Sequence, residues 1–247
     1  MLTGRYGSRD VSAQGRSEPG FGQHATTLVN SSKLQGSDLT YTLANQLREH
    51  GGFRTIVAGK WHVSADRQAD FESYEACLDA VNSSGITDPA AIYITNMNNQ
   101  DIPFSHNLEW TTAAANSAIE DAVSNGQPFF LYYALTAPNG PSTFDAFDFS
   151  LTATPAGALD TAPDSGMART RAELRTLADG SDYNAGLMWV DDALGSVLNK
   201  LEAIDELDNT LVIITMDHGQ TAKGTLYQGG ARVVMMARLP GEIPAGS

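Results

Sequence analysis

Residues 54–62 read RTIVAGKWH, an uninterrupted apolar run that ends in a lysine, a tryptophan and a histidine. Continuous apolar runs of this length are typical of strands buried on both faces, as in a mostly parallel sheet. Four further runs have the same continuous character: residues 91–95 (AIYIT), 128–135 (PFFLYYAL), 210–216 (TLVIITM) and 232–238 (RVVMMAR). The five runs predict a buried sheet.

Helical patterns separate these runs. We expect helices at residues 38–50, 109–125 and 182–204; in the last of them a single apolar stripe is formed by Leu187, Val190, Leu194, Val197, Leu198 and Leu201. Helices that alternate with strands predict an α/β fold, which we interpret as one domain over residues 1–247. Residues 139–168 are rich in Pro, Gly, Ser, Thr and Asp, which predicts a long loop or insertion over one end of the sheet.

The charge and the composition exclude several classes of protein. The net charge of −14 argues against a nucleic-acid binder. No apolar run approaches the roughly 20 residues that a membrane-spanning helix needs. One cysteine, Cys77, permits no internal disulfide.

Residues that carry chemistry follow the predicted strands, where open α/β sheets bind their ligands. Lys60 and His62 are two residues apart, so in extended backbone they point to the same side. A fixed cation beside an imidazole suits an anionic group with a proton to move. The alternative is a strand end with a solvated lysine and a hydrogen-bonded histidine.

A second candidate corner follows the run at 210–216. Asp217, His218 and Gly219 place a carboxylate beside an imidazole at a sharp turn, which predicts a metal corner or, alternatively, a capping pair. Lys223 follows in a loop next to a glycine. The chain has only four lysines, and Lys60 and Lys223 both follow predicted strands, where a strongly acidic protein needs cations to hold an anion.

Together these segments resemble the sulfatase family, the formylglycine-dependent sulfuric ester hydrolases of the alkaline phosphatase superfamily. The resemblance rests on five segments in the family's order: Thr3-Gly4-Arg5, GKWH at 59–62, PFFLYYALTAP at 128–138, DHG at 217–219 and KGTLYQGG at 223–230. It implies an alkaline-phosphatase-like fold, with a mostly parallel sheet sandwiched by helices.

The resemblance also implies a mechanism. The nucleophile is a formylglycine, made from the cysteine or serine of a C/S-x-P-x-R segment, and a divalent cation, usually Ca²⁺, polarises the sulfate. By motif position Asp217 and His218 are metal ligands. The nucleophile segment is expected upstream of Met1, since no stretch of residues 1–247 matches it.

Further residues take roles by motif position. Lys60 contacts the sulfate oxygens, His62 hydrogen-bonds the nucleophile, Lys223 binds sulfate or assists the leaving group, and Arg5 braces the nucleophile loop. Asn139 stands where the family usually has a histidine. Asparagine donates a hydrogen bond but carries no titratable proton.

The same comparison makes the chain look shortened at both ends, without the family's first strand and its C-terminal subdomain. The implied substrate is a small-molecule or carbohydrate sulfate ester, and a periplasmic or secreted location follows from the resemblance alone. Two alternatives stay open: a phosphonate or phosphate ester hydrolase of the same superfamily, and a fragment or pseudoenzyme without catalysis. An exposed apolar sheet edge would favour aggregation and so argue against an independent short protein.

Overall fold

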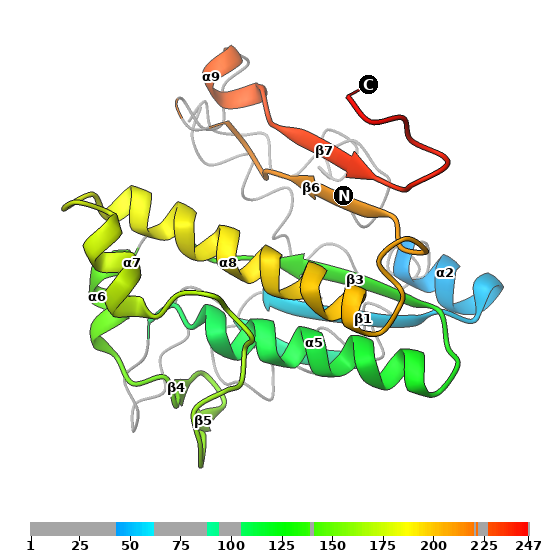
Figure 1. The fold of residues 1–247 in the computed structure, drawn as a ribbon, viewed down its shortest axis with the longest axis horizontal. Coiled ribbons are helices and arrows are strands. Elements are labelled where there is room, and N and C mark those ends of the chain that lie inside the picture. The colour runs from blue at the N-terminus through cyan, green and yellow to red at the C-terminus, as the bar shows by residue number, and fades with distance from the viewer. Residues whose placement is uncertain are drawn as a thin grey trace, which may run out of the picture.

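The protein has an α/β fold in which helices flank a parallel sheet (Figure 1). This confirms the expected fold class. The computed structural model describes residues 43–61, 88–93, 105–138, 141–219, 221 and 227–246.

Three strands form the parallel sheet in the order β2-β1-β3: β1 (Arg54–Lys60), β2 (Asp88–Tyr93) and β3 (Phe129–Ala134). The predicted strands at 54–60 and 128–135 are confirmed. The predicted strand at 91–95 begins three residues earlier, and its last two residues lie outside the described ranges. β1 is central, and its apolar residues at 56–58 are fully buried, as a continuous run of β-branched and small side chains requires.

Helix α5 (Leu108–Ser124) confirms the helix predicted at 109–125 and packs on the sheet through β1 and β2. The side chain of Asn107 caps it by accepting a hydrogen bond from the Trp110 amide at 2.9 Å. Helix α2 (Leu43–Gly51) covers most of the predicted 38–50 helix, of which residues 38–42 are not described, and leads directly into β1. In the described part of the chain, no helix combines the length and apolarity needed to cross a membrane.

Helix α8 (Asp182–Ala203) confirms the helix predicted at 182–204, but its buried face differs from the predicted stripe. Leu201 is buried, whereas Leu187 is 43% exposed. Trp189 and Ala193 are instead fully buried, in a cluster with residues of α6 and α7. Val190 of the predicted stripe packs against this cluster, so the stripe is wrong at Leu187 only, because the packing partners decide which face of a helix is most buried.

The segment expected to be a long loop at 139–168 is more regular than predicted. Its described part, from residue 141, contains helix α6 (Thr143–Asp148) and a small antiparallel pair, β4 (Ala153–Thr154) and β5 (Gly157–Ala158). The Ser142 hydroxyl caps α6 by accepting from the Asp145 amide. Helix α7 (Arg171–Leu177) follows behind a Thr170–Glu173 capping box. Local capping residues thus create order that the overall composition conceals.

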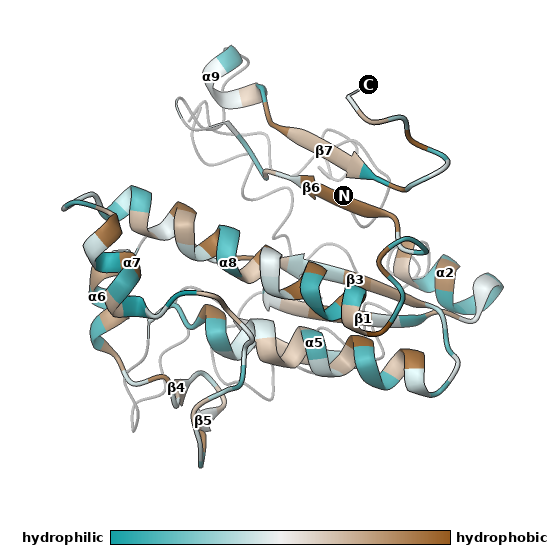
Figure 2. Ribbon diagram, viewed as in Figure 1, coloured by the Kyte–Doolittle hydropathy of each residue, from teal (hydrophilic) through white to brown (hydrophobic). Residues whose placement is uncertain are grey.

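The last strands form a separate antiparallel pair, β6 (Val212–Thr215) and β7 (Met235–Arg238), with the short helix α9 (Gln228–Ala231) between them in the chain. Both strands lie within their predicted runs, but the prediction that they are buried is wrong: Ile213 is 51% exposed and Met235 is 67% exposed. Figure 2 shows the apolar colouring of the pair. Among the described residues the two strands pair with each other and with no third strand.

Candidate active site

Lys60 is the last residue of β1, at the carboxyl edge of the parallel sheet, and it is half-buried. Gly59 precedes it with a φ of 89°, and a Cβ on Gly59 would overlap the carbonyl oxygen of Ala134 on β3. Only glycine permits this conformation and this close approach. Gly59 therefore sets how the chain reaches Lys60.

Trp61 anchors the end of β1 after Lys60. Its side chain is 1% exposed, and its ring meets the ring of Tyr132 on β3 edge to face at 6.3 Å between centroids. Such pairs add packing energy beyond the buried area. His62 follows Trp61 and lies outside the described residues.

Tyr132 connects this edge with the corner after β6. Burial raises the pKa of Tyr132, and the negative charge of Asp217 raises it further, which places Asp217 within electrostatic reach of β3. Trp61 and Asp217, one from each predicted corner, therefore both act on Tyr132.

Asp217 and His218 form a local pair two to three residues after the end of β6. The His218 Nδ1 lies 2.6 Å from the carbonyl oxygen of Gly219. Because a carbonyl only accepts, Nδ1 carries a hydrogen, and in the neutral ring Nε2 keeps its lone pair. That Nε2 lies 3.5 Å from Oδ2 of Asp217, whose side chain is 82% exposed. Nε2 of His218 and Oδ2 of Asp217, two atoms that can each bind a cation, are therefore adjacent.

This spacing fits neighbouring ligands of one cation. Two ligands at right angles, each at the usual Ca²⁺–oxygen distance, are about 3.3–3.7 Å apart. The carboxylate suits Ca²⁺ well, whereas an imidazole is a softer ligand. Within the described ranges no group of three or more His, Cys, Asp or Glu residues could hold a metal. The pair by itself therefore offers two ligand atoms, fewer than a Ca²⁺ ion takes.

Glycines hold this corner in place. The Gly219 amide donates to the carbonyl of Gly230 at 2.9 Å, and the Thr221 amide donates to the carbonyl of Gly229 at 3.0 Å. A Cβ on Gly219 would overlap the Gly229 carbonyl. The segment from 221 to 229, which includes Lys223 in the sequence, therefore begins and ends at the Asp217–His218 corner. The sequence analysis does not predict this contact. Its only signal in the sequence is the presence of glycines in two separate segments, at Gly219 and at Gly229-Gly230.

The remaining predicted site residues are Arg5, His62, Asn139 and Lys223, and all four lie outside the described residues. Their roles stay predictions. Of the described candidates, Asp217 and His218 are in contact. Lys60 is the last residue of β1, which pairs with β3, the strand that contains Tyr132.

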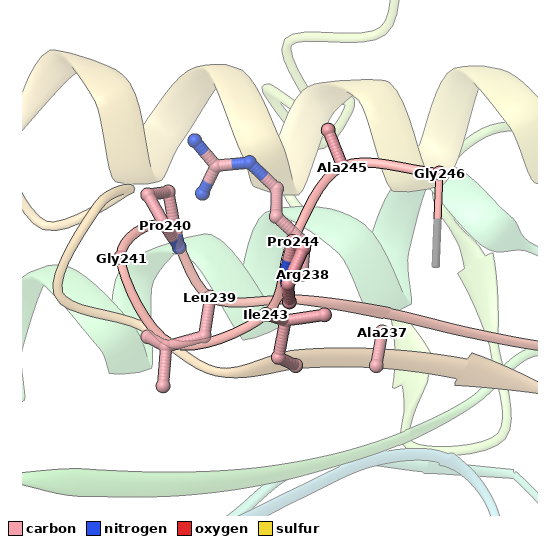
Figure 3. A pocket seen from close by; sticks show the side chains of 9 residues that line it. All are labelled: Ala237, Arg238, Leu239, Pro240, Gly241, Ile243, Pro244, Ala245 and Gly246. Atoms are coloured by element: carbon pink, nitrogen blue, oxygen red, sulfur yellow. The ribbon is translucent and has the colours of Figure 1, made fainter.

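A cavity of about 500 Å³ lies elsewhere, at the C-terminal end of β7 and the segment that follows (Figure 3). Arg238, Pro240 and Ile243 are among its lining residues, and none of the predicted site residues is. The Arg238 guanidinium is already bound to the Leu207 carbonyl and the Asp208 carboxylate, each at 2.6 Å. This cavity has no link to the chemistry predicted at the strand ends.

The structure thus combines a parallel sheet that carries Lys60 at its carboxyl edge with a carboxylate–imidazole pair at Asp217 and His218. The family model described as Sulfatase matches residues 1–247. The chain belongs to the sulfatase family.

Individual relatives agree with this assignment. The chain is 23% identical to the uncharacterized sulfatase YdeN of Escherichia coli over 253 residues, which is 91% of this chain and 40% of YdeN. It is 25% identical to human arylsulfatase A over 281 residues, which is 97% of this chain and 50% of that enzyme. The chain thus spans about half, or less, of the length of these relatives.

A solved structure supports the fold. The structure of the PsFucS1 sulfatase from Pseudoalteromonas sp. superimposes with a TM-score of 0.51 at 19% identity, over 90% of this chain and 51% of the other. At this identity the likeness establishes the fold, and the chemistry must be argued from this chain's own residues.

Proposed function

We propose that this chain contributes the carboxyl-edge half of a sulfatase active site, which hydrolyses sulfate esters. One observation carries the proposal: Nε2 of His218 and Oδ2 of Asp217 lie 3.5 Å apart just after β6, at the spacing of neighbouring ligands of one cation. In this proposal the candidate cation-binding pair and the cationic side chain of Lys60 border one region. A sulfate ester, which is anionic, suits such a region.

In this proposal Lys60 holds the sulfate oxygens by charge-assisted hydrogen bonds, which strengthen as negative charge grows on them. Lys223 binds the same group from the loop that starts and ends at the glycine contact, and there it assists the leaving group. His62 hydrogen-bonds the nucleophile, Arg5 braces the nucleophile segment, and Asn139 donates a hydrogen bond.

Asp217 and His218 are proposed to hold a divalent cation, with Ca²⁺ the first candidate, through the Oδ2 and Nε2 atoms described above. The bound cation would supply Lewis-acid polarisation of the sulfate. The formylglycine implied by the family resemblance would supply covalent catalysis. Asp217 and His218 would act as two neighbouring cation ligands. The hydrogen bond from Gly219 to Gly230 restrains the turn that carries them.

The substrate class is tested with the longest reading frame that contains residues 1–247. The assay compares hydrolysis of an aryl sulfate, an aryl phosphate and an aryl phosphonate, and then a panel of sulfated sugars. We expect the aryl sulfate to be preferred by kcat/KM. Preference for the phosphonate or the phosphate would support the other branch of the superfamily, and no turnover of any ester by a folded, cation-loaded protein would support a non-catalytic role.

A further inference from the structure

His106 is a buried histidine that the proposed chemistry does not use. It precedes α5 and is 1% exposed. Its Nε2 lies 3.0 Å from the carbonyl oxygen of Pro141, 35 residues further along the chain. Because that carbonyl only accepts, Nε2 is the donor. His106 thus ties the start of α5 to the segment that leaves β3.

Asp182, the first residue of α8, holds the same segment from another side. Its Oδ1 accepts from the Ser142 hydroxyl and from the Phe144 amide, each at 2.7 Å. Burial alone would raise the pKa of Asp182, but the hydrogen bonds and the nearby His106 outweigh it and lower that pKa. The carboxylate is therefore kept ionised at the start of α6.

Gly186 completes the contact one turn further along α8. A Cβ on Gly186 would lie 2.6 Å from Cβ of Pro138 and 2.8 Å from Oγ1 of Thr143. Real Cβ atoms do not approach so closely, so only glycine lets α8 come this near to Pro138. Pro138 and residues 141–144 are thus held by His106, Asp182 and Gly186.

This segment leaves β3 at the edge of the sheet where Lys60 ends β1, because Gly59 and Ala134 are neighbours in the parallel register. We propose that His106 is a positioning residue that, with Asp182 and Gly186, fixes Pro138 and residues 141–144, which follow β3, for binding of the substrate anion at this edge. The inference rests on the proposed function. His106 lies behind the segment, buried, and acts through the Pro141 carbonyl rather than by touching substrate.

The test compares His106→Leu with His106→Gln, whose side-chain amide can replace Nε2 as a donor. Hydrogen exchange of the Phe144 amide reports on the contact, and titration with inorganic sulfate reports on the site. We expect His106→Leu to speed exchange by about tenfold or more and to weaken sulfate binding by about fivefold or more, with His106→Gln close to the wild type.

A second pair of variants leaves His106 untouched. Gly186→Ala forces the segment away from α8, whereas Gly195→Ala, in the same helix, meets nothing within 4 Å. We expect Gly186→Ala to weaken sulfate binding and Gly195→Ala to leave it unchanged. If His106→Leu fails to fold, the comparison of these two glycine variants tests the positioning role instead.

Each outcome has a distinct meaning. Unchanged Phe144 exchange in His106→Leu would overturn the contact, and faster exchange with wild-type sulfate affinity would overturn the positioning role. A folded wild type that binds no sulfate would overturn the proposed function, and the exchange comparison would then decide on the contact alone.

Discussion

Arg171 and Glu109 form a buried, two-pronged ion pair between helices α7 and α5. The Nε–Oε1 distance is 2.9 Å and the Nη2–Oε2 distance is 2.7 Å, and the two side chains are 9% and 11% exposed. Arg171 also donates to the carbonyls of Ala146 and Phe149 and lies over the Trp189 ring at 5.1 Å. One guanidinium thus joins α5, α6, α7 and α8 behind the sheet.

Removing one partner of this pair should strongly destabilise the fold. Glu109→Gln leaves the Arg171 charge buried without its counter-charge, and we expect the free energy of unfolding to fall by about 3–5 kcal/mol. Urea unfolding followed by circular dichroism measures the change. The control is Arg175→Met, which breaks the 2.6 Å pair with Asp148 at 42% and 72% exposure and should lower stability by about 1 kcal/mol or less. Equal losses in the two variants would contradict the buried character of the first pair.

Gly59 should be intolerant of any side chain. Its φ of 89° is strained for other residues, and a Cβ would overlap the Ala134 carbonyl. We expect Gly59→Ala to lower the free energy of unfolding by about 3 kcal/mol or more, since strain and overlap add. Gly52 also has a positive φ, of 66°, but no atom lies within 4 Å of its Cβ position, so Gly52→Ala should lose only about 1–2 kcal/mol. Thermal unfolding of both variants measures the two losses, and their difference gives the cost of the overlap with Ala134 apart from the cost of the backbone strain.

Those two glycines show how far sequence reasoning reached. The central strand and the α5 and α8 helices were predicted, because continuous apolar runs and helical periodicity are local signals. The close approach of Gly59 to Ala134 was not, because the two residues are 75 positions apart in the chain. The exposure of Leu187 on α8 was missed for the same reason. Leu187 is as apolar as any residue in the predicted stripe, yet the cluster around Trp189 selects a different face.

In the candidate site, too, local features were predictable from the sequence and long-range contacts were not. Asp217 and His218 were predicted from their adjacency, and the structure places their donor atoms 3.5 Å apart. The contact of Gly219 with Gly230 and the link from His106 to Pro141 join residues distant in the sequence. The first contact has only the two separated glycine segments as a signal in the sequence, and the second has none.

The protein should lose stability in alkali through Tyr133. Burial raises the pKa of Tyr133 to about 12, while hydrogen bonds with Thr111 and Thr112 act in the opposite direction. In the unfolded chain tyrosine ionises near pH 10, so the folded state retains this proton longer. Its contribution to stability is complete below about pH 10 and is lost as the pH rises from about 10 towards 12. Urea unfolding at several alkaline pH values should show this slope, and Tyr133→Phe should remove it. An identical slope in that variant would assign the effect to other groups.

Lys60 should be required for turnover if it holds the substrate anion. In the longest reading frame we expect Lys60→Ala to lower kcat/KM for an aryl sulfate by about 10²–10³, as for loss of a group that stabilises developing negative charge. Lys60→Arg keeps the charge and should retain more activity. The control is Lys200→Ala, since Lys200 pairs with Glu120 on the surface at 2.9 Å and faces no predicted chemistry. Comparable activity in the two alanine variants would exclude Lys60 from the site.

The apolar β6–β7 pair should make residues 1–247, expressed as such, associate. Val234, Met235 and Met236 are 54%, 67% and 55% exposed, and Met235 lies on the same face of the pair as Ile213, which is 51% exposed. Exposed patches of this kind, on a strand pair with open edges, favour self-association. Light scattering after size exclusion should show oligomers, and Met235→Lys should shift the population towards the monomer. Leu177→Lys is the control, because Leu177 is 59% exposed on α7, far along the chain from this patch, and its replacement should leave the distribution unchanged. A monodisperse, cooperatively unfolding wild type would instead favour an independent protein whose strands are covered within the chain itself.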